Sequence, residues 1–260
     1  TRRTPGTGDI SGSEPLTTAP GTVVALEPEH YAATADPPTT AARAGARGAR
    51  RAPLSLAAQL GEDITADRLR VPPEPPAEGQ WRFIGQDPAG PTAFDPCRPI
   101  PYRVRVGPGP ADGVELVAQA LARVSEATGL RFVFDGTTDV APTSASFPSP
   151  NSKVDLAEAF TPAIIGWAER GETDLWATDG EDTLGTGGQR TIMFSDGRKL
   201  AVSGFALVVP SDALRPGFGP GMSVGNVLLH ELGHLVGLDH VEDRAELMQA
   251  RFDRSIPDGW

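Results

Sequence analysis

The chain has 260 residues and a formal net charge of −11. An acidic chain lacks the basic face that phosphate binding requires, so we expect no nucleic acid among its partners. No run of eighteen apolar residues occurs, and therefore no segment is predicted to span a membrane.

The N-terminal region differs in composition from the rest of the chain. Residues 1–78 are rich in Ala, Thr, Pro and Arg and show little apolar periodicity. Such a segment buries too little apolar surface to fold alone, so we predict a disordered N-terminal tail or prosegment over residues 1–78. The remaining residues, 79–260, are long enough to bury a core and form one domain. Since the chain starts at Thr1 rather than Met, we expect an export signal or anchor outside it.

Residues 100–134 are predicted to form a strand, a helix and a second strand. Residues 100–106 alternate apolar and basic side chains, which is typical of a half-buried strand. Residues 112–128 form an amphipathic helix that Gly129 ends. Its apolar face is predicted to consist of Val114, Val117, Leu121 and Val124.

The second strand, 130–134, is predicted to stop at Asp135 and Gly136. Two strands joined by a single helix favour parallel pairing with a right-handed crossover.

Residues 137–182 are predicted to be mostly loop around one buried strand. The strand, 163–168, is apolar on both faces and therefore central. The loop 169–182 that follows is acidic, and its carboxylates form a candidate site for Ca²⁺.

A glycine-rich stretch, 183–188, precedes two further strands. Glycines in a strand often mark the close approach of another backbone, so this stretch is either an edge strand that pairs with an extended peptide or a plain loop. Residues 191–194 and 203–209 are predicted strands, separated by a turn at Asp196 and Gly197.

The stretch from His230 to His240 holds three of the four histidines of the chain. We predict a helix that Ser223 caps and that presents His230 and His234, four residues apart, from one face to a single metal ion. Gly237 can take a left-handed conformation that ends the helix and returns His240 as a third nitrogen ligand. Glu231 lies about 100° around the helix from His230, where it can face a water on the metal.

This stretch reads H-E-x-x-H-x-x-G-x-x-H and resembles the zinc-binding motif of the metzincin endopeptidases. Within that group, residues 81–250 look most like a matrixin. Gly233 precedes His234, Asp239 precedes His240, and Met248 stands eight residues after the last ligand, where matrixins carry the Met of their Met-turn.

The resemblance implies an α+β metzincin (zincin-like) fold. Its expected parts are a twisted five-stranded mixed sheet with an antiparallel edge strand, a helix after the first strand and a zinc-binding active-site helix. It also implies one catalytic Zn²⁺ held by His230, His234 and His240, and a protein or peptide substrate lying along the edge strand. We further expect a monomer that is secreted or held at the cell surface.

Several positions depart from the matrixin pattern. Val241 stands where Ser is usual, and Gln249 and Ala250 replace Tyr-Pro after the Met. Only His30 remains for a second, structural zinc, so we expect that site to be absent. The helix that follows the Met-turn in matrixins is expected to be missing from this chain. Cys97 is the only cysteine; its context does not match the matrixin latency motif, and we predict a partly buried structural thiol.

The ligand set predicts the reaction. Three neutral imidazoles leave zinc an open position for water, and Glu231 accepts the proton of that zinc-bound water and passes it to the leaving amine. The predicted function is a zinc-dependent endopeptidase. Two alternatives remain: a zinc amidase acting on cell-wall peptides, and a non-catalytic surface module in which zinc only braces the fold.

Overall fold

The structure is a computed structural model. It describes residues 23–26, 79–87, 90–147, 159–176, 183–194, 197–251 and 253–259. Within these ranges no helix has the length and apolarity needed to cross a bilayer.

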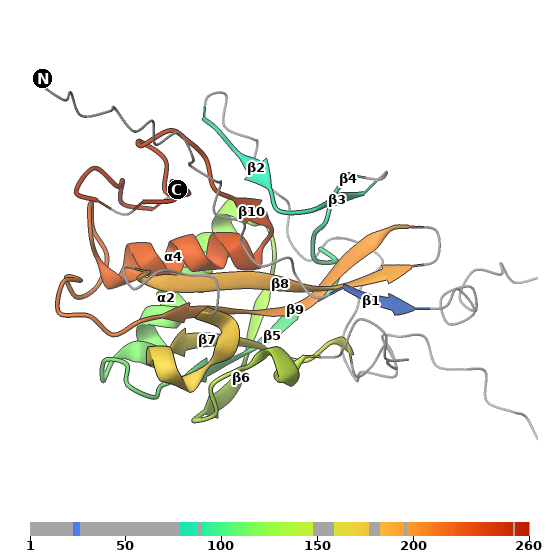
Figure 1. Ribbon diagram of the computed structural model, residues 1–260, viewed down its shortest axis with the longest axis horizontal. Helices are drawn as coiled ribbons and strands as arrows, with labels where there is room; N and C mark the ends of the chain where they lie inside the picture. Colours follow the sequence, from blue (N-terminus) through green and yellow to red (C-terminus); the bar gives the residue numbers. More distant parts are fainter. Residues whose placement is uncertain are drawn as a thin grey trace, which may run out of the picture.

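A mixed sheet with strand order β1-β8-β9-β7-β5-β6 forms the centre of the fold (Figure 1). The neighbouring strands β9, β7, β5 and β6 run parallel to one another, and β8 runs antiparallel to β9. This confirms the predicted five-stranded mixed sheet, the crossover after the first strand and the central place of β7. The five strands are β5 (Ile100–Arg105), β6 (Phe132–Thr138), β7 (Ala163–Trp167), β8 (Gly185–Phe194) and β9 (Lys199–Val208).

A sixth strand comes from the N-terminal segment. β1 (Val23–Leu26) pairs in parallel with residues 191–194 of β8. These four residues are not disordered as predicted; the other residues of 1–78 lie outside the described residues, so the proposed domain division stays a prediction.

Helix α2 (Gly113–Thr128) follows β5 and ends at Gly129, whose φ of +74° is the predicted left-handed cap. The buried stripe of α2 begins at Gly113 rather than at Val114, which is 36% exposed and was wrongly predicted to be core. The reason is close packing, because a Cβ on Gly113 would lie 2.8 Å from the ring of Trp167.

Strand β6 does not stop at Asp135 and Gly136 as predicted. It continues to Thr138, and its register with β5 shifts between the pairs Tyr102–Phe134 and Val104–Thr137. Gly136 has a φ of +94°, which allows the extra residue to form a bulge, and Arg103 Nε donates to Asp135 Oδ2 at 2.8 Å across it. The Asp-Gly pair therefore bends the strand instead of ending it.

Strand β8 unites two predicted pieces. The glycine-rich stretch and residues 191–194 form one strand of ten residues that pairs along β9. The glycine-rich stretch is thus a strand from Gly185 onwards rather than a plain loop, while its pairing with an extended peptide stays a prediction. The predicted turn between β8 and β9 includes Gly197 with a φ of +85°, while Ser195 and Asp196 lie outside the described residues.

Two layers cover the sheet. Helix α4 (Val224–Leu235) packs on β8 and β9, α2 packs on β5 and β7, and the two helices contact each other, so both lie on one face. A second apolar cluster on the other face joins Phe147 and Trp176 to Phe205 and Leu207 of β9. This cluster includes part of the segment with three short 3-10 turns, η3 (Ser144–Ser146), η4 (Arg170–Glu172) and η5 (Asp174–Trp176).

Two small strand pairs flank the sheet. β3 (Gln86–Asp87) pairs with β4 (Gly90–Pro91), and β2 (Arg82–Phe83) pairs with β10 (Leu238–Asp239). The second pair ties the start of the folded domain to the end of the histidine motif. No helix follows Met248 among the described residues up to 259.

Candidate metal centre

Helix α4 places the first two histidines. As predicted, Ser223 caps the helix, because its hydroxyl accepts a hydrogen bond from Asn226 N at 3.2 Å. Asn226 fixes the same end: its Nδ2 donates to the carbonyls of Gly219, Gly221 and Pro257. His230 and His234 then project from one face of α4 and are 4% and 3% exposed.

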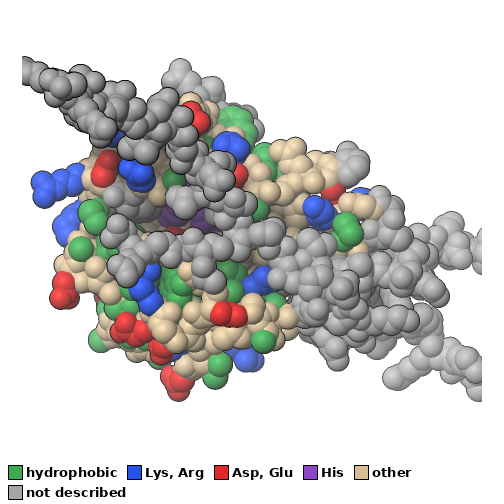
Figure 2. Space-filling model, in the orientation of Figure 1, with side chains coloured by type: hydrophobic (Ala, Val, Ile, Leu, Met, Phe, Trp, Pro, Cys, Tyr) green, Lys and Arg blue, Asp and Glu red, His purple; other side chains and the backbone are tan. Residues whose placement is uncertain are grey.

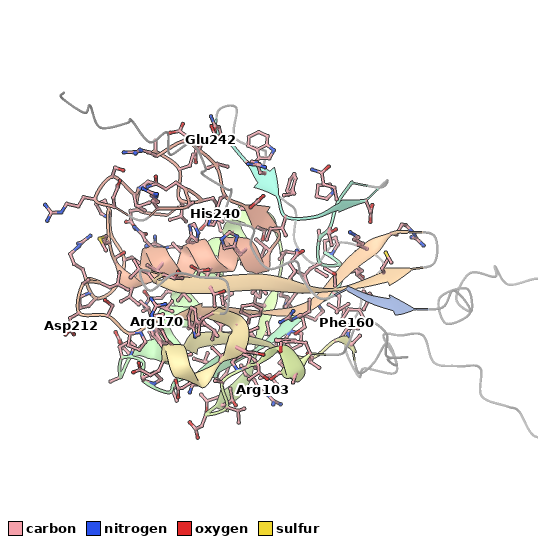
Figure 3. The ribbon with its side chains drawn as sticks, viewed as in Figure 1. Arg103, Phe160, Arg170, Asp212, His240 and Glu242 are labelled. Atoms are coloured by element: carbon pink, nitrogen blue, oxygen red, sulfur yellow. The ribbon has the colours of Figure 1, made fainter. Side chains whose placement is uncertain are left out.

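A tight turn brings in the third histidine. Gly237 has a φ of +103°, and a Cβ there would lie 2.7 Å from Gln189 Nε2, so only glycine fits this turn well. Ile84 N donates to Gly237 O at 3.0 Å, and β10 pairs with β2 directly before His240. His240 consequently returns beside α4 (Figure 3).

The three imidazoles converge through their Nε2 atoms. His240 Nε2 lies 3.1 Å from the Nε2 atoms of both His230 and His234. Three nitrogens bound to one tetrahedral zinc at about 2.0–2.1 Å would stand about 3.3 Å apart, so the observed spacing fits Zn²⁺. Histidine side chains, coloured purple in Figure 2, are visible on the surface at this point.

Backbone carbonyls orient two of these rings. His230 Nδ1 lies 2.8 Å from Leu247 O, and His234 Nδ1 lies 2.8 Å from Leu238 O. A carbonyl only accepts, so each Nδ1 must carry the proton and donate it, which leaves Nε2 with the lone pair that a metal needs. Sequence reasoning missed Leu238 and Leu247, because any residue type can supply a carbonyl.

The predicted Met-turn contacts the site through a backbone carbonyl. Leu247, whose carbonyl holds His230, directly precedes Met248, which is buried at 5% exposure. Val241 N donates to Met248 O at 3.0 Å, and this bond links the residue after the third ligand to the turn. Met248 therefore takes part in the packing that positions the ligands.

Burial keeps the three imidazoles neutral. Desolvation, together with repulsion from the other two histidines, holds the pKa of His230 well below its usual value. Burial and repulsion from His240 lower the pKa of His234 to about 4, and burial also lowers the pKa of His240. Since only a neutral imidazole ligates a metal, these shifts favour metal binding at neutral pH.

The side chain of Glu231 lies between its own helix, α4, and the glycine-rich part of β8. It is 5% exposed, and a Cβ on Gly185 would stand only 2.4 Å from its Oε1. A Cβ on Gly187 would stand 2.2 Å from its backbone oxygen. A close approach of another backbone to the glycine-rich stretch was predicted, and the backbone that approaches it is that of α4.

The metal-ligand geometry occurs once among the residues that the structure describes. Only His230, His234 and His240 form a group of possible ligand atoms there, all within 4.8 Å of one another. These three histidines are therefore the candidate zinc ligands.

The acidic loop gives no such group within its described part. Glu172 binds the guanidinium of Arg105 at 2.7 Å, which lowers its pKa, and hydrogen bonds from Ser144 lower the pKa of Asp174. Residues 177–182 lie outside the described residues, so the calcium site stays a prediction. Cys97 is partly buried, as expected, in the segment before β5.

Two comparisons with known proteins bear on this site. The model of a protein family described as Matrixin matches residues 109–257, which is more than half of the chain and includes every residue of the histidine motif. A search of curated proteins finds no match.

Proposed function

This chain belongs to the matrixin family of zinc metalloproteases, and we propose that it is an endopeptidase that hydrolyses internal peptide bonds of proteins. The observation that carries the proposal is the convergence of three neutral imidazoles, in which His240 Nε2 lies 3.1 Å from the Nε2 atoms of both other histidines, with Glu231 directly after the first of them.

The metal would be held by the Nε2 atoms of His230, His234 and His240. When bound there, Zn²⁺ supplies Lewis acidity, which lowers the pKa of water and stabilises negative charge on a carbonyl oxygen. The protein keeps the ligand nitrogens deprotonated by burial and holds two of the rings in place through Leu238 and Leu247.

Glu231 is the proposed general base. Its carboxylate would take a proton from the attacking water and later give that proton to the leaving amine. Gly185 supports this assignment, because the space left by its missing side chain is where the carboxylate of Glu231 lies. The general base is therefore set by contact between α4 and β8.

The outer edge of β8 is the proposed substrate edge. Over residues 185–190, β8 pairs with β9 on one side, and no other described strand pairs with its second side. An extended peptide can add to such an edge through backbone hydrogen bonds, and Gly185 would bring it past Glu231.

The non-catalytic alternative is disfavoured by the ligand count. A purely structural zinc is usually closed by four protein ligands, and the described residues offer three at this point. The amidase alternative uses the same chemistry and differs only in substrate, so it must be separated by assay.

We also propose that the protein acts outside the cell, at its surface or after secretion. This rests on the family, whose members are typically extracellular.

The test has two arms. Metal analysis of the purified protein should find one zinc, and protein substrates should be cleaved at internal bonds only until a zinc chelator is added. A parallel digest of cell-wall peptides separates the amidase. Zinc without any cleavage of protein would favour the bracing module, and cleavage that survives complete removal of zinc would overturn the proposal.

A further inference from the structure

Strand β6 forms the edge of the sheet opposite to the metal centre. Among the described strands, only β5 pairs with it. Ile100 N donates to Arg131 O at 2.8 Å, so the backbone groups of Arg131 and Val133 point towards β5. Phe132 and Phe134 alternate with these residues along the strand. Their backbone N–H and C=O groups consequently point to the open edge.

This edge also exposes apolar side chains. Val133 is 40% exposed and Phe134 is 48% exposed, which is unusual for large apolar residues on a strand. Phe134 lies with its ring 5.6 Å from that of Tyr102 on the neighbouring strand. The strand is thus both unpaired and apolar along its outer side.

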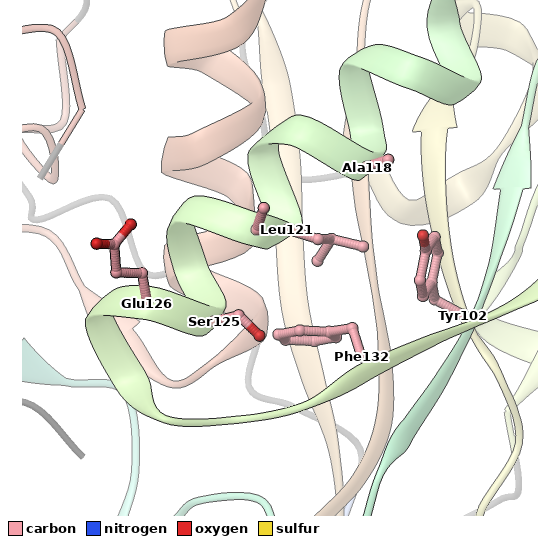
Figure 4. Close-up of a pocket in the computed structure, with 7 residues that line it drawn as sticks. Tyr102, Ala118, Leu121, Ser125, Glu126 and Phe132 are labelled. Carbon is pink, nitrogen blue, oxygen red and sulfur yellow. The ribbon is translucent and has the colours of Figure 1, made fainter. Parts of the chain in front are cut away.

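An open groove runs beside the strand (Figure 4). It lies between α2 and the strands β5 and β6 and has a volume of about 470 Å³. Figure 4 shows Leu121 of α2 facing the rings of Tyr102 and Phe132, while Glu126 lies at the end of the groove. Side chains of an added strand would meet a mixed surface here, with Leu121, Tyr102 and Phe132 in its apolar part and Ser125 and Glu126 in its polar part.

The sequence of the edge is complementary to itself. Residues 131–135 read Arg-Phe-Val-Phe-Asp, so the order of chemical types is the same from either end except that the charge changes sign. Antiparallel pairing of two copies centred on Val133 places Arg131 of one copy opposite Asp135 of the other, twice. It also places Phe132 opposite Phe134.

The hydrogen-bond pattern agrees with this register. In an antiparallel pair, the residues that exchange hydrogen bonds are those whose N–H and C=O groups point outwards on both strands. Phe132 and Phe134 are such residues, and the centred register sets them opposite each other. A shift by two residues would keep the backbone bonds but would set Arg131 opposite an uncharged residue.

We infer that β6 is a homodimer interface, at which a second copy of this chain adds its own β6 in antiparallel orientation. Phe134 of each copy then covers the open side of the other's groove beside Phe132. Asp135, which already accepts from Arg103, gains Arg131 of the second copy. The two metal centres lie at the outer edges of the joined sheet, so each protomer keeps its own site.

This interface replaces the monomer expected from sequence. Charge complementarity between the two copies decides the occupant, because an unrelated peptide has no reason to carry acidic and basic residues four positions apart in this order. If an N-terminal segment of the same chain covered β6 instead, the protein would remain monomeric.

The test uses a charge swap in the full chain. Sedimentation velocity is run from about 1 to 200 µM, with Glu231→Gln in every variant so that self-cleavage cannot occur. The protein should shift from monomer to dimer with concentration. Arg131→Glu and Asp135→Arg should each set like charges opposite each other and raise the dimer dissociation constant at least tenfold.

A mixture of the two single variants is the decisive sample. Glu at position 131 of one copy then faces Arg at position 135 of the other, and the unchanged Asp135 faces the unchanged Arg131, so a heterodimer should form at the concentration at which the parent dimerises. Val133→Lys at the centre should abolish dimers. Melting curves confirm that each variant is folded, since Asp135→Arg also removes the contact with Arg103.

Three results would overturn the inference. These are a parent protein that stays monomeric at about 200 µM, single variants that dimerise as tightly as the parent, and folded single variants whose mixture gives no heterodimer.

Discussion

The two long helices lie side by side on one face of the sheet, yet they bury different kinds of residue. α2 buries a stripe that is apolar except for Ser125 and leaves its other polar side chains at least partly in solvent. In α4, every residue from Gly225 to Leu235 is buried, including Asn226, His230, Glu231 and His234.

The difference shows that α4 buries polar groups at a cost in folding free energy. Burying a polar group is unfavourable unless it finds a partner, and backbone carbonyls are partners of Asn226, His230 and His234. The carboxylate of Glu231 lies against Gly185 of β8. α2 serves packing alone, whereas α4 joins packing to chemistry, so equivalent substitutions in the two helices should have unequal effects.

The largest contrast is expected between the glutamates. Glu231→Ala should retain zinc and lower kcat by about 10²- to 10⁴-fold, because the general base is removed while the ligands remain. Glu126→Ala, at an exposed position of α2, is the matched control and should leave kcat unchanged. Zinc content and peptide cleavage of both variants decide this; equal activity of Glu231→Ala and the parent protein would refute the mechanism.

The second contrast concerns pH. In the metal-free protein, burial holds the pKa of His234 near 4, while the unfolded chain titrates near 6.5. As pH falls below 6.5, the unfolded state takes up the proton first, so stability is intact above 6.5 and is lost as pH falls towards 4. The full loss is on the order of 3 kcal/mol, at about 1.4 kcal/mol per pKa unit.

Urea unfolding of the metal-free protein at pH 7 and pH 5 measures this effect. His234→Gln removes the titrating group, so its stability should change less between the two pH values. Nothing comparable is expected from α2, which holds no histidine. An unchanged midpoint between pH 7 and pH 5 would contradict the expectation.

The third contrast is between two amides. Asn226→Ala should lower the free energy of unfolding by about 2 kcal/mol, because one buried and two partly buried carbonyls lose their donor. Gln119→Ala on α2 removes a single exposed hydrogen bond to Glu115 and should cost less than about 0.5 kcal/mol. Chemical denaturation of the two variants gives both values; an equal loss would show that burial on α4 does not matter.

The sequence predicted the parts of the site that depend on local spacing. The four-residue interval of His230 and His234 follows from the helical period, and Gly237 and Ser223 follow from the conformations that helix ends require. Strands β5 and β7 likewise followed from their residue patterns to within one residue, whereas β9 begins at Lys199, four residues before the predicted start at Ser203.

The rest depends on partners distant along the chain. The pairing of β2 with β10 joins residues more than 150 positions apart, and the carbonyls of Leu238 and Leu247 have no side-chain identity to recognise. The bulge in β6 resembles a turn in sequence, since Asp-Gly favours both. In β8, the spacing of the glycines indicated a close backbone but could not say that the backbone was α4.

That contact between β8 and α4 gives the smallest expected effect. Gly185→Ala adds a Cβ 2.4 Å from Glu231 Oε1, so the carboxylate must move away from its place, whereas Gly171→Ala meets nothing within 4 Å and is the matched control. We expect about a tenfold loss of kcat in Gly185→Ala. A small displacement of the carboxylate weakens proton transfer without abolishing it. Zinc content and melting temperature should stay near those of the parent protein. If kcat is unchanged while both variants are folded, then Glu231 is free to reposition, and the contact with β8 does not set the general base.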